Sequence, residues 1–364
     1  MINVLSLRRK LALEVEHQVQ NNLIKLHPLR EVVWECTLRC NLHCRHCGSD
    51  CHTVASQPDM PIEEFLKVLD SVKRSGADTH RVMITITGGE PLMRPDLEEC
   101  GRAIYEREFP WGMVSNGLFL TPQRFQRLLA AGLHTMTLSL DGLEELHNWM
   151  RGNPKSFSQV DQALDLLVKE PCIIFDVVTC VNRRNYATLP QIRDYLIHKG
   201  VKAWRLFSIF PVGRAAQDPE MQLKPYEFRG MFDFIRQTRR EGIIRASYGC
   251  EGFLGNLEGE VRDHLFLCHA GITTGSVLAD GSISACPSIR ADYHQGNIYE
   301  DDFMEVWENR YQVYRNREWA RKDECKECKF FRYCRGNGMH LRDGNGKLLF
   351  CHLKRLKQAE GAIV

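Results

Sequence analysis

Short apolar runs alternate with segments of helical periodicity from about residue 30 to residue 242. The runs read EVVWE, VMITITGG, GMVSNG, TMTLSLDG, CIIFDVVTCV and AWRLFSIF. Between the first two runs, apolar side chains recur every three or four positions, at Ile62, Phe65, Leu66, Leu69 and Val72. Six such strand–helix units predict an α/β fold with a parallel sheet and helices outside it, as an open barrel or a doubly wound sheet.

Polar and glycine-rich motifs follow four of these predicted strands. In both candidate architectures ligands bind at the C-terminal ends of the strands. A cysteine-rich stretch follows the first strand, GGEP (Gly88 to Pro91) the second, SNG (Ser115 to Gly117) the third and SLDG (Ser139 to Gly142) the fourth. The sequence therefore predicts one shared site at this end of the sheet.

The character of the chain changes after about residue 243. GSVLADGSISAC alternates around Asp280 and Gly281, which predicts a hairpin with a two-residue turn. A second group of cysteines follows, so this part reads as a small module held together by metal more than by its core. We expect three parts: a helical extension (1–28), the main α/β domain (29–242) and the cysteine-rich module (243–364).

Composition excludes several classes of protein. The 48 basic and 46 acidic residues give a net charge of +2, whereas a nucleic-acid surface usually needs a clear basic excess. We find no apolar run long enough for a transmembrane helix and no signal peptide, and we expect a cytoplasmic protein. LRRKLAL near the N-terminus predicts an ordinary amphipathic helix, with a membrane-surface helix as the less favoured alternative.

The fifteen cysteines are many for a cytoplasmic chain. Because disulfides are rare in a reducing compartment, clustered cysteines indicate metal or redox chemistry. The isolated Cys100, Cys172 and Cys180 are interpreted as small buried hydrophobes.

Five cysteines fall between residues 36 and 51, in CTLRCNLHCRHCGSDC. Two spacings could bring three thiolates together: Cys40-x3-Cys44-x2-Cys47, or Cys44-x2-Cys47-x3-Cys51. Zinc would need a fourth ligand, whereas a cubane iron–sulfur cluster held by three thiolates keeps one iron open. Spacing alone does not decide between the two metals.

The first spacing, after a first strand, resembles the cluster motif of the radical S-adenosylmethionine (SAM) enzymes. TGGEPLMRPDL resembles their segment that binds the SAM amino group, and SNG and SLDG resemble the strand ends that contact its ribose and carboxylate. VTCVNRRN resembles the next strand end, and PVGRA (Pro211 to Ala215) recurs in one subgroup that includes haem-modifying members. The resemblance implies a partial (β/α)6 barrel of the TIM type.

The resemblance also implies a site. A [4Fe–4S] cluster would be held by Cys40, Cys44 and Cys47, leaving Cys36 and Cys51 outside it as a strand-end hydrophobe and a loop residue. Its open iron would bind SAM, and reductive cleavage would give a 5′-deoxyadenosyl radical that abstracts hydrogen. The implied SAM-binding set is Gly88, Gly89, Glu90, Pro91, Ser115, Asn116, Ser139, Asp141 and Asn182.

The second cysteine group is similar to the SPASM extension of peptide-modifying radical SAM enzymes, which carries auxiliary iron–sulfur clusters. By resemblance, one auxiliary cluster has a complete set of four ligands, Cys325, Cys328, Cys334 and Cys351. The other lacks one cysteine, because Gly338 stands at its position. It keeps Cys268 and Cys286, with Cys250 as a possible third ligand. Without the upstream motif, a four-cysteine zinc ribbon would be the ordinary interpretation.

The resemblance predicts an oxidoreductase that matures a peptide or protein, with an electron donor such as flavodoxin or ferredoxin. The 39 residues before Cys40 are too few for a leader-binding domain, so a separate leader-binding protein is a possible partner. One alternative is a SPASM-type enzyme that acts on a tetrapyrrole or other small molecule. A zinc-stabilised binding module is a further alternative. The catalytic residues are not predicted.

Overall fold

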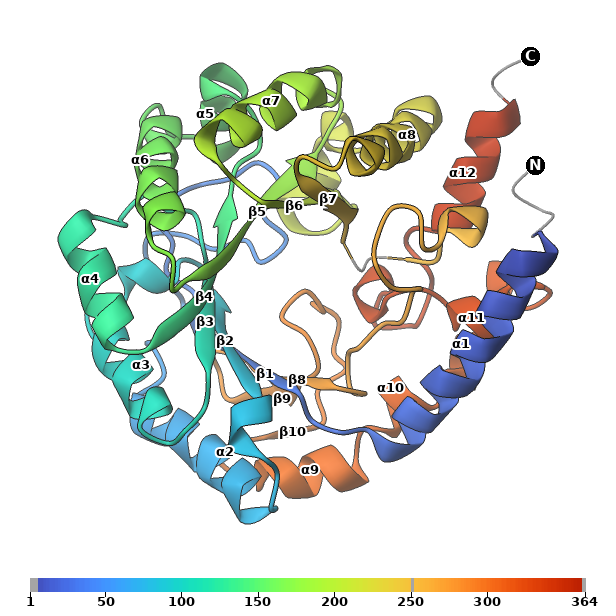
Figure 1. The fold of residues 1–364 in the computed structure, drawn as a ribbon. Coiled ribbons are helices and arrows are strands. Elements are labelled where there is room, and N and C mark those ends of the chain that lie inside the picture. The colour runs from blue at the N-terminus through green and yellow to red at the C-terminus, as the bar shows by residue number, and fades with distance from the viewer. Residues whose placement is uncertain (1–5, 250–251, 362–364) are drawn as a thin grey trace.

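The computed structural model describes residues 6–249 and 252–361. Its centre is one ten-stranded sheet in the order β10-β9-β8-β1-β2-β3-β4-β5-β6-β7. The strands are β1 (Glu31–Thr37), β2 (Met83–Gly88), β3 (Trp111–Ser115), β4 (Leu133–Ser139), β5 (Ile174–Val181), β6 (Ala203–Ser208), β7 (Arg245–Tyr248), β8 (Thr274–Val277), β9 (Ser282–Ser284) and β10 (Gly296–Asn297). Figure 1 shows this sheet curling into an open barrel with helices around its outside.

The predicted α/β fold with a partial barrel is confirmed. Strands β1 to β7 are all parallel, and β8 also pairs in parallel with β1. The hairpin β8–β9 and the pair β9–β10 are antiparallel. Among the described residues β7 and β10 end the sheet without pairing to each other, so the barrel is not closed.

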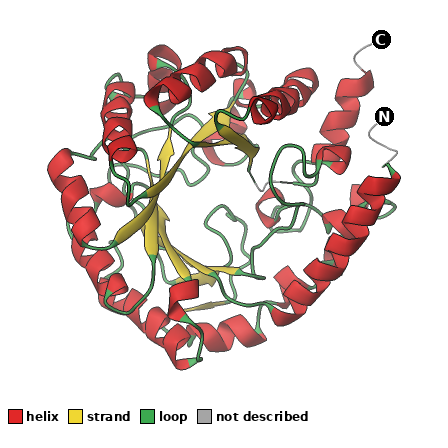
Figure 2. Ribbon diagram, in the orientation of Figure 1, coloured by secondary structure: helices red, strands yellow, loops and turns green. Residues whose placement is uncertain are grey.

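The helices alternate with the strands in sequence and cover the convex side of the sheet (Figure 2). They are α1 (Leu7–Leu26), α2 (Ile62–Arg74), α3 (Leu97–Tyr105), α4 (Pro122–Ala130), α5 (Glu144–Arg151), α6 (Ser156–Lys169), α7 (Leu189–Lys199), α8 (Pro225–Glu241), α9 (Phe303–Asn309), α10 (Gln312–Arg315), α11 (Phe331–Cys334) and α12 (His352–Gly361). Their apolar stripes are buried against the strands. For example, the ring of Phe65 on α2 stacks on Trp34 of β1 at a centroid distance of 4.4 Å. This burial provides the main driving force for the barrel.

The division of the chain at residues 242 and 243 remains a prediction. Gly242 ends α8 in the left-handed conformation, but the sheet continues past it, because β7 pairs with β6 and β8 pairs with β1. The predicted hairpin at Asp280 and Gly281 is present with a longer connection, since Val277 is the last residue that pairs, opposite Ile283.

The concave side of the sheet borders a cavity of about 610 Å³, which we call the lumen. Side chains from β1, β2, β3, β4, β6 and β8 form one wall, and Cys268, Cys286, Pro287, Met339 and His340 form the other. A smaller cavity of about 190 Å³ lies beside it and shares Thr87 and Pro287 with it. Along the described chain, no helix has both the length and the apolar character needed to cross a membrane.

Candidate active site

The loop after β1 brings Cys40, Cys44 and Cys47 together. Cys40 and Cys44 are each 8% exposed and form one buried cluster with Leu42, against which Cys47 packs. Burial is the main reason that the pKa of Cys40 is raised to about 12, and the nearby Glu90, Cys44 and Cys47 add to the effect. The three cysteines of the first spacing are therefore neighbours in space as well as in sequence.

The two remaining cysteines of this stretch differ from each other. Cys36 is fully buried in β1 and belongs to the main hydrophobic core, as expected of a strand-end hydrophobe. Cys51 lies in a loop, as predicted, and its thiol donates to the Ser49 carbonyl oxygen at 3.9 Å. Interaction with Cys51, mainly with its side chain, lowers the pKa of Cys47. Cys51 therefore supports a predicted ligand, which its position in the sequence does not reveal.

Gly88 and Gly89 let the end of β2 run directly beside the start of the cysteine loop. A Cβ atom on Gly88 would lie 2.1 Å from the Thr37 carbonyl oxygen, and one on Gly89 would lie 2.2 Å from the Arg39 carbonyl oxygen. Instead, Gly89 N–H donates to Thr37 at 2.8 Å and Glu90 N–H donates to Arg39 at 2.8 Å. Only glycine allows this approach, so the two glycines position the loop that carries the cysteines.

Glu90 is a buried carboxylate that joins three strand ends. It is 1% exposed, and its oxygens accept hydrogen bonds from Ser115 Oγ (2.7 Å), Asn116 N–H (2.7 Å) and Leu92 N–H (3.1 Å). Burial raises the pKa of Glu90, and these hydrogen bonds offset part of the effect. Asn116 Nδ2 also donates to Asn41 at 2.8 Å and contacts Cys40 Sγ at 4.0 Å. The second and third motifs thus converge on the cysteine loop, as predicted from the strand order.

Asp141, from the fourth motif, forms a buried ion pair with Arg151 at 2.7 Å. Burial alone would raise the pKa of Asp141, but Arg151, His46 and His147 together lower it. Arg151 Nη1 also lies 3.7 Å from Cys44 Sγ. Arg151 therefore links the end of β4 to the cysteine loop. Arg151 lies on α5, outside every motif, so the sequence pattern does not reveal it.

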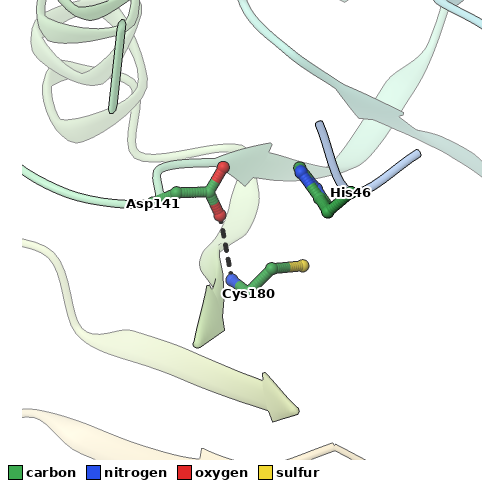
Figure 3. Close-up of side chains that lie close together, drawn as sticks. All are labelled: His46, Asp141 and Cys180. Carbon is green, nitrogen blue, oxygen red and sulfur yellow. Dashed lines mark hydrogen bonds between the residues drawn. The ribbon is translucent and has the colours of Figure 1, made fainter. Parts of the chain in front are cut away.

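Three side chains from separate segments point toward one another beside this pair (Figure 3). Ligand atoms of His46, Asp141 and Cys180 lie within 4.8 Å of one another, and the backbone N–H of Cys180 donates to Asp141 at 2.9 Å. Burial lowers the pKa of His46 to about 4, so its ring is neutral at pH 7. Its Nδ1 atom is buried without a hydrogen-bond partner among the described residues. An unsatisfied nitrogen in a polar pocket fits a site that receives a polar ligand.

Other sequence-based expectations for single residues need correction or refinement. Cys172 is exposed rather than buried, and Cys180 is half-buried in this pocket rather than packed as a simple hydrophobe. Cys100 is fully buried, as expected.

Asn182, one of the predicted SAM-binding residues, is buried. Its side-chain oxygen accepts hydrogen bonds from the backbone N–H groups of Arg184 and Asn185, so it stabilises the local turn. Pro91 begins a short 3-10 helix and Ser139 ends β4; their roles with SAM remain predictions.

The PVGRA segment (Pro211 to Ala215) contacts the cysteine loop through Gly213 and Arg214. Arg214 donates from Nε to the Cys44 carbonyl oxygen at 2.8 Å and from its backbone N–H to the Cys47 carbonyl oxygen at 3.1 Å. It also forms an ion pair with Asp50 at 2.6 Å. Gly213 has φ of 58°, and a Cβ atom there would lie 2.5 Å from the Cys47 carbonyl oxygen. This motif therefore clamps the loop.

The second cysteine group also gathers in space. Cys325, Cys328, Cys334 and Cys351 interact with one another electrostatically. Burial is the main reason that the pKa of Cys351 is raised to about 11. Arg342 contacts Cys325 Sγ at 3.5 Å. The four predicted ligands of one auxiliary cluster are thus neighbours.

The other predicted auxiliary site is less complete. Cys268 and Cys286 both border the lumen, whereas Cys250 falls outside the described residues. Arg317 is buried, contacts the Cys268 side chain and lies near Cys334. Burial lowers the pKa of Arg317, and the cysteines partly offset this. A buried cation therefore lies between the two groups of cysteines.

Comparison with known proteins identifies the family. The radical SAM superfamily model matches residues 34–196, and the SPASM model, an iron–sulfur cluster-binding domain, matches residues 268–329. This chain carries a radical SAM domain and a SPASM domain. It therefore uses SAM and a [4Fe–4S] cluster in the region of the Cys40 motif, with auxiliary clusters in its SPASM domain. The assignment of individual residues to these groups remains our prediction.

Two curated proteins and one solved structure illustrate what this radical SAM protein is similar to. An AdoMet-dependent heme synthase of Methanosarcina barkeri is 26% identical over 325 residues, covering 84% of this chain and 90% of that protein. The mycofactocin maturase MftC of Mycobacterium tuberculosis is 26% identical over 319 residues, covering 85% and 78%. The solved structure of native anSMEcpe with bound AdoMet has a TM-score of 0.69 at 21% identity, covering 92% of this chain and 95% of that one. The last likeness supports the fold.

Substitution of single cysteines tests the ligand set. We expect Cys40→Ala to remove about four iron atoms per chain, because two thiolates do not retain a [4Fe–4S] cluster. Cys36→Ala and Cys51→Ala should keep the iron content of the wild type. Iron and acid-labile sulfide assays after anaerobic reconstitution measure all three variants. Loss of the cluster in Cys51→Ala would mean that the second spacing is the correct one.

Substitution of Gly213 tests the clamp. Gly213→Ala should displace the Cys47 carbonyl and lower the iron bound by the cysteine loop, because its Cβ atom has no room. Gly242→Ala is the matched control: its φ is also positive, at 72°, but nothing lies within 4 Å of its Cβ position. It should cost about 1 kcal/mol of stability, the cost of a side chain in the left-handed region, and leave the iron content unchanged. Equal iron loss in both variants would contradict the clamp.

Metal analysis tests the C-terminal group. The purified chain should contain iron and sulfide rather than zinc, and Cys328→Ala should remove about four iron atoms. This variant should still cleave SAM in the absence of substrate, because the cluster at the first loop is intact. Stoichiometric zinc in the wild-type protein would overturn the assignment.

Proposed function

We propose that this radical SAM enzyme abstracts a hydrogen atom from a peptide or protein segment that enters the lumen. In this proposal Cys40, Cys44 and Cys47 hold the [4Fe–4S] cluster. Glu90, His46 and Asp141 line the adjoining SAM site. Cluster and SAM together supply reductive cleavage of the sulfonium and hydrogen abstraction. The pairing of a buried carboxylate at Glu90 with a nitrogen at His46 that lacks a partner supports this placement.

The protein groups have three tasks in this proposal. The buried Glu90 carboxylate offers a charge-assisted contact to the ammonium group of SAM. Arg151 offsets the negative charge of Asp141 and of the Cys44 thiolate, both of which it contacts. Burial of Cys40 and Cys44 at 8% exposure keeps bulk water from the reacting groups.

The side chains that line the lumen indicate the kind of substrate that would fit there. A row of threonines from β2, β4 and β8 faces the cavity with Glu31 and Arg205. Glu31 accepts hydrogen bonds from Thr85 (2.7 Å) and Thr274 (3.3 Å), and Arg205 pairs with Asp176. The lining therefore sets several hydroxyl groups within a mainly apolar surface, and its charges nearly cancel. Such a surface suits the neutral donors and acceptors of a peptide backbone.

A tetrapyrrole is the second candidate, and the 26% identity to an AdoMet-dependent heme synthase favours it. Tetrapyrroles of the coproporphyrin type carry several propionate groups, which need cations in their site. The lumen offers Arg30 and Arg205, but Arg205 is paired and Glu31 offsets Arg30. Burial lowers the pKa of His269 to about 4, so that ring is neutral at pH 7. We therefore rank the peptide first.

Two further parts of the proposal concern partners and location. An electron donor such as flavodoxin or ferredoxin would reduce the cluster, and a separate leader-binding protein would present the peptide. We place the enzyme in the cytoplasm, because a reducing compartment preserves its many free thiols. The similarity to MftC, whose name is that of a maturase, supports a peptide substrate.

Product analysis separates the candidates. The reconstituted full chain is incubated with SAM and dithionite, with either iron coproporphyrin III or any short polypeptide found to be encoded beside its gene. We expect a polypeptide to raise 5′-deoxyadenosine formation several-fold and to change in mass, and the tetrapyrrole to do neither. Cys40→Ala serves as the control without a cluster.

Two results would contradict the peptide proposal. Conversion of iron coproporphyrin III with stimulated 5′-deoxyadenosine release would establish the second candidate. No 5′-deoxyadenosine from the wild type under any condition, with Cys40→Ala indistinguishable from it, would refute the enzymatic proposal.

A further inference from the structure

The N-terminal helix α1 presents a row of aliphatic side chains to solvent. Leu7, Leu11, Val15 and Val19 are spaced four residues apart and are 73%, 60%, 66% and 54% exposed, and Leu26 extends the row at 71%. Residues four apart lie on one face of a helix. These five are a third of the fifteen large exposed hydrophobic residues among the described residues. Single exposed apolar residues are normal on proteins, but a continuous row marks an interaction surface.

The opposite face of α1 already holds the helix on the protein. Leu13 is buried, Gln20 donates to the Phe266 carbonyl oxygen at 3.0 Å, and Glu14 pairs with Arg332 at 2.8 Å. In Figure 1, α1 lies at the periphery of the molecule with α11 on its inner side. The exposed row is therefore not needed to attach α1, and the high exposure of its members shows that no described residue covers it.

The charges beside the row have one sign. The exposed charged residues of α1 are Arg8, Lys10 and Lys25, all cationic. Its acidic residues, Glu14 and Glu16, are half-buried, and both hydrogen bond to neighbours. The solvent-facing side of α1 thus combines aliphatic side chains with positive charge, and the partly exposed carboxylate of Glu14 is paired with Arg332.

We propose that α1 docks this enzyme on an anionic membrane surface. A helix that lies in the plane of a membrane interface has an apolar face flanked by Lys and Arg, which face anionic headgroups. A second copy of this chain is a poorer occupant, because pairing two such rows would bring like charges together. The helix lies on the bilayer and does not cross it, which agrees with its composition. This inference is independent of the substrate.

Vesicle co-sedimentation of the full chain tests the proposal. The protein should bind vesicles of phosphatidylcholine mixed with phosphatidylglycerol, bind phosphatidylcholine alone far more weakly, and be released by salt. The triple variant Arg8→Gln/Lys10→Gln/Lys25→Gln should bind the anionic vesicles about a hundredfold more weakly, since each cation near such a surface contributes about fivefold. Leu11→Gln/Val15→Gln should bind them at least about a hundredfold more weakly, since each buried aliphatic side chain contributes about tenfold or more.

Matched controls exclude general effects. Ile174→Gln/Ile243→Gln removes two side chains that are 63% and 62% exposed elsewhere on the surface, and it should bind vesicles like the wild type. Equal binding to both kinds of vesicle, or to neither, would overturn the proposal without recourse to any variant. So would a dimer in sedimentation velocity that Leu11→Gln/Val15→Gln abolishes, because the row would then join two copies.

Discussion

The close backbone contact between the end of β2 and the start of the cysteine loop is the constraint on which the site depends. Gly88 and Gly89 leave room for two hydrogen bonds to Thr37 and Arg39, which lie immediately before Cys40. Cys40 itself donates its backbone N–H to the His52 carbonyl oxygen. The loop has little regular structure of its own, so such external contacts fix its path. These contacts, together with the small buried cluster of Cys40, Leu42 and Cys44, hold the three thiols near one another.

Other strand ends secure the same loop from two more sides. The helix α5 places Arg151 against Cys44, and the Met150 carbonyl oxygen accepts a hydrogen bond from Arg45 N–H. After β6, Arg214 donates hydrogen bonds to the Cys44 and Cys47 carbonyl groups, and Gly213 leaves room for this close approach. PVGRA therefore has a structural task that any substrate would permit. Its resemblance to haem-modifying members consequently carries little weight in the choice between a peptide and a tetrapyrrole.

Local pattern predicted the fold well, because apolar periodicity along the chain defined the strands and helices. The order of intervening residues, through its resemblance to the radical SAM motif, selected Cys40, Cys44 and Cys47 as candidate ligands. Contacts between distant segments were not visible in this way. Arg151 lies outside any motif, and Cys180 reads as one apolar position in a strand until β5 brings it beside Asp141. The role of Cys51 likewise depends on how the loop folds back onto Cys47.

Each group of cysteines has a buried arginine against one of its sulfurs. Arg151 lies 3.7 Å from Cys44, Arg342 lies 3.5 Å from Cys325, and Arg317 contacts Cys268. Thiolates grouped around iron carry negative charge into a region of low dielectric constant, where an uncompensated charge is costly. The guanidinium groups supply the compensation and cannot be deprotonated in proteins. The recurrence of this arrangement at three separate places, from α5 to the C-terminal segment, is the physical signature expected of a chain built to hold several anionic clusters.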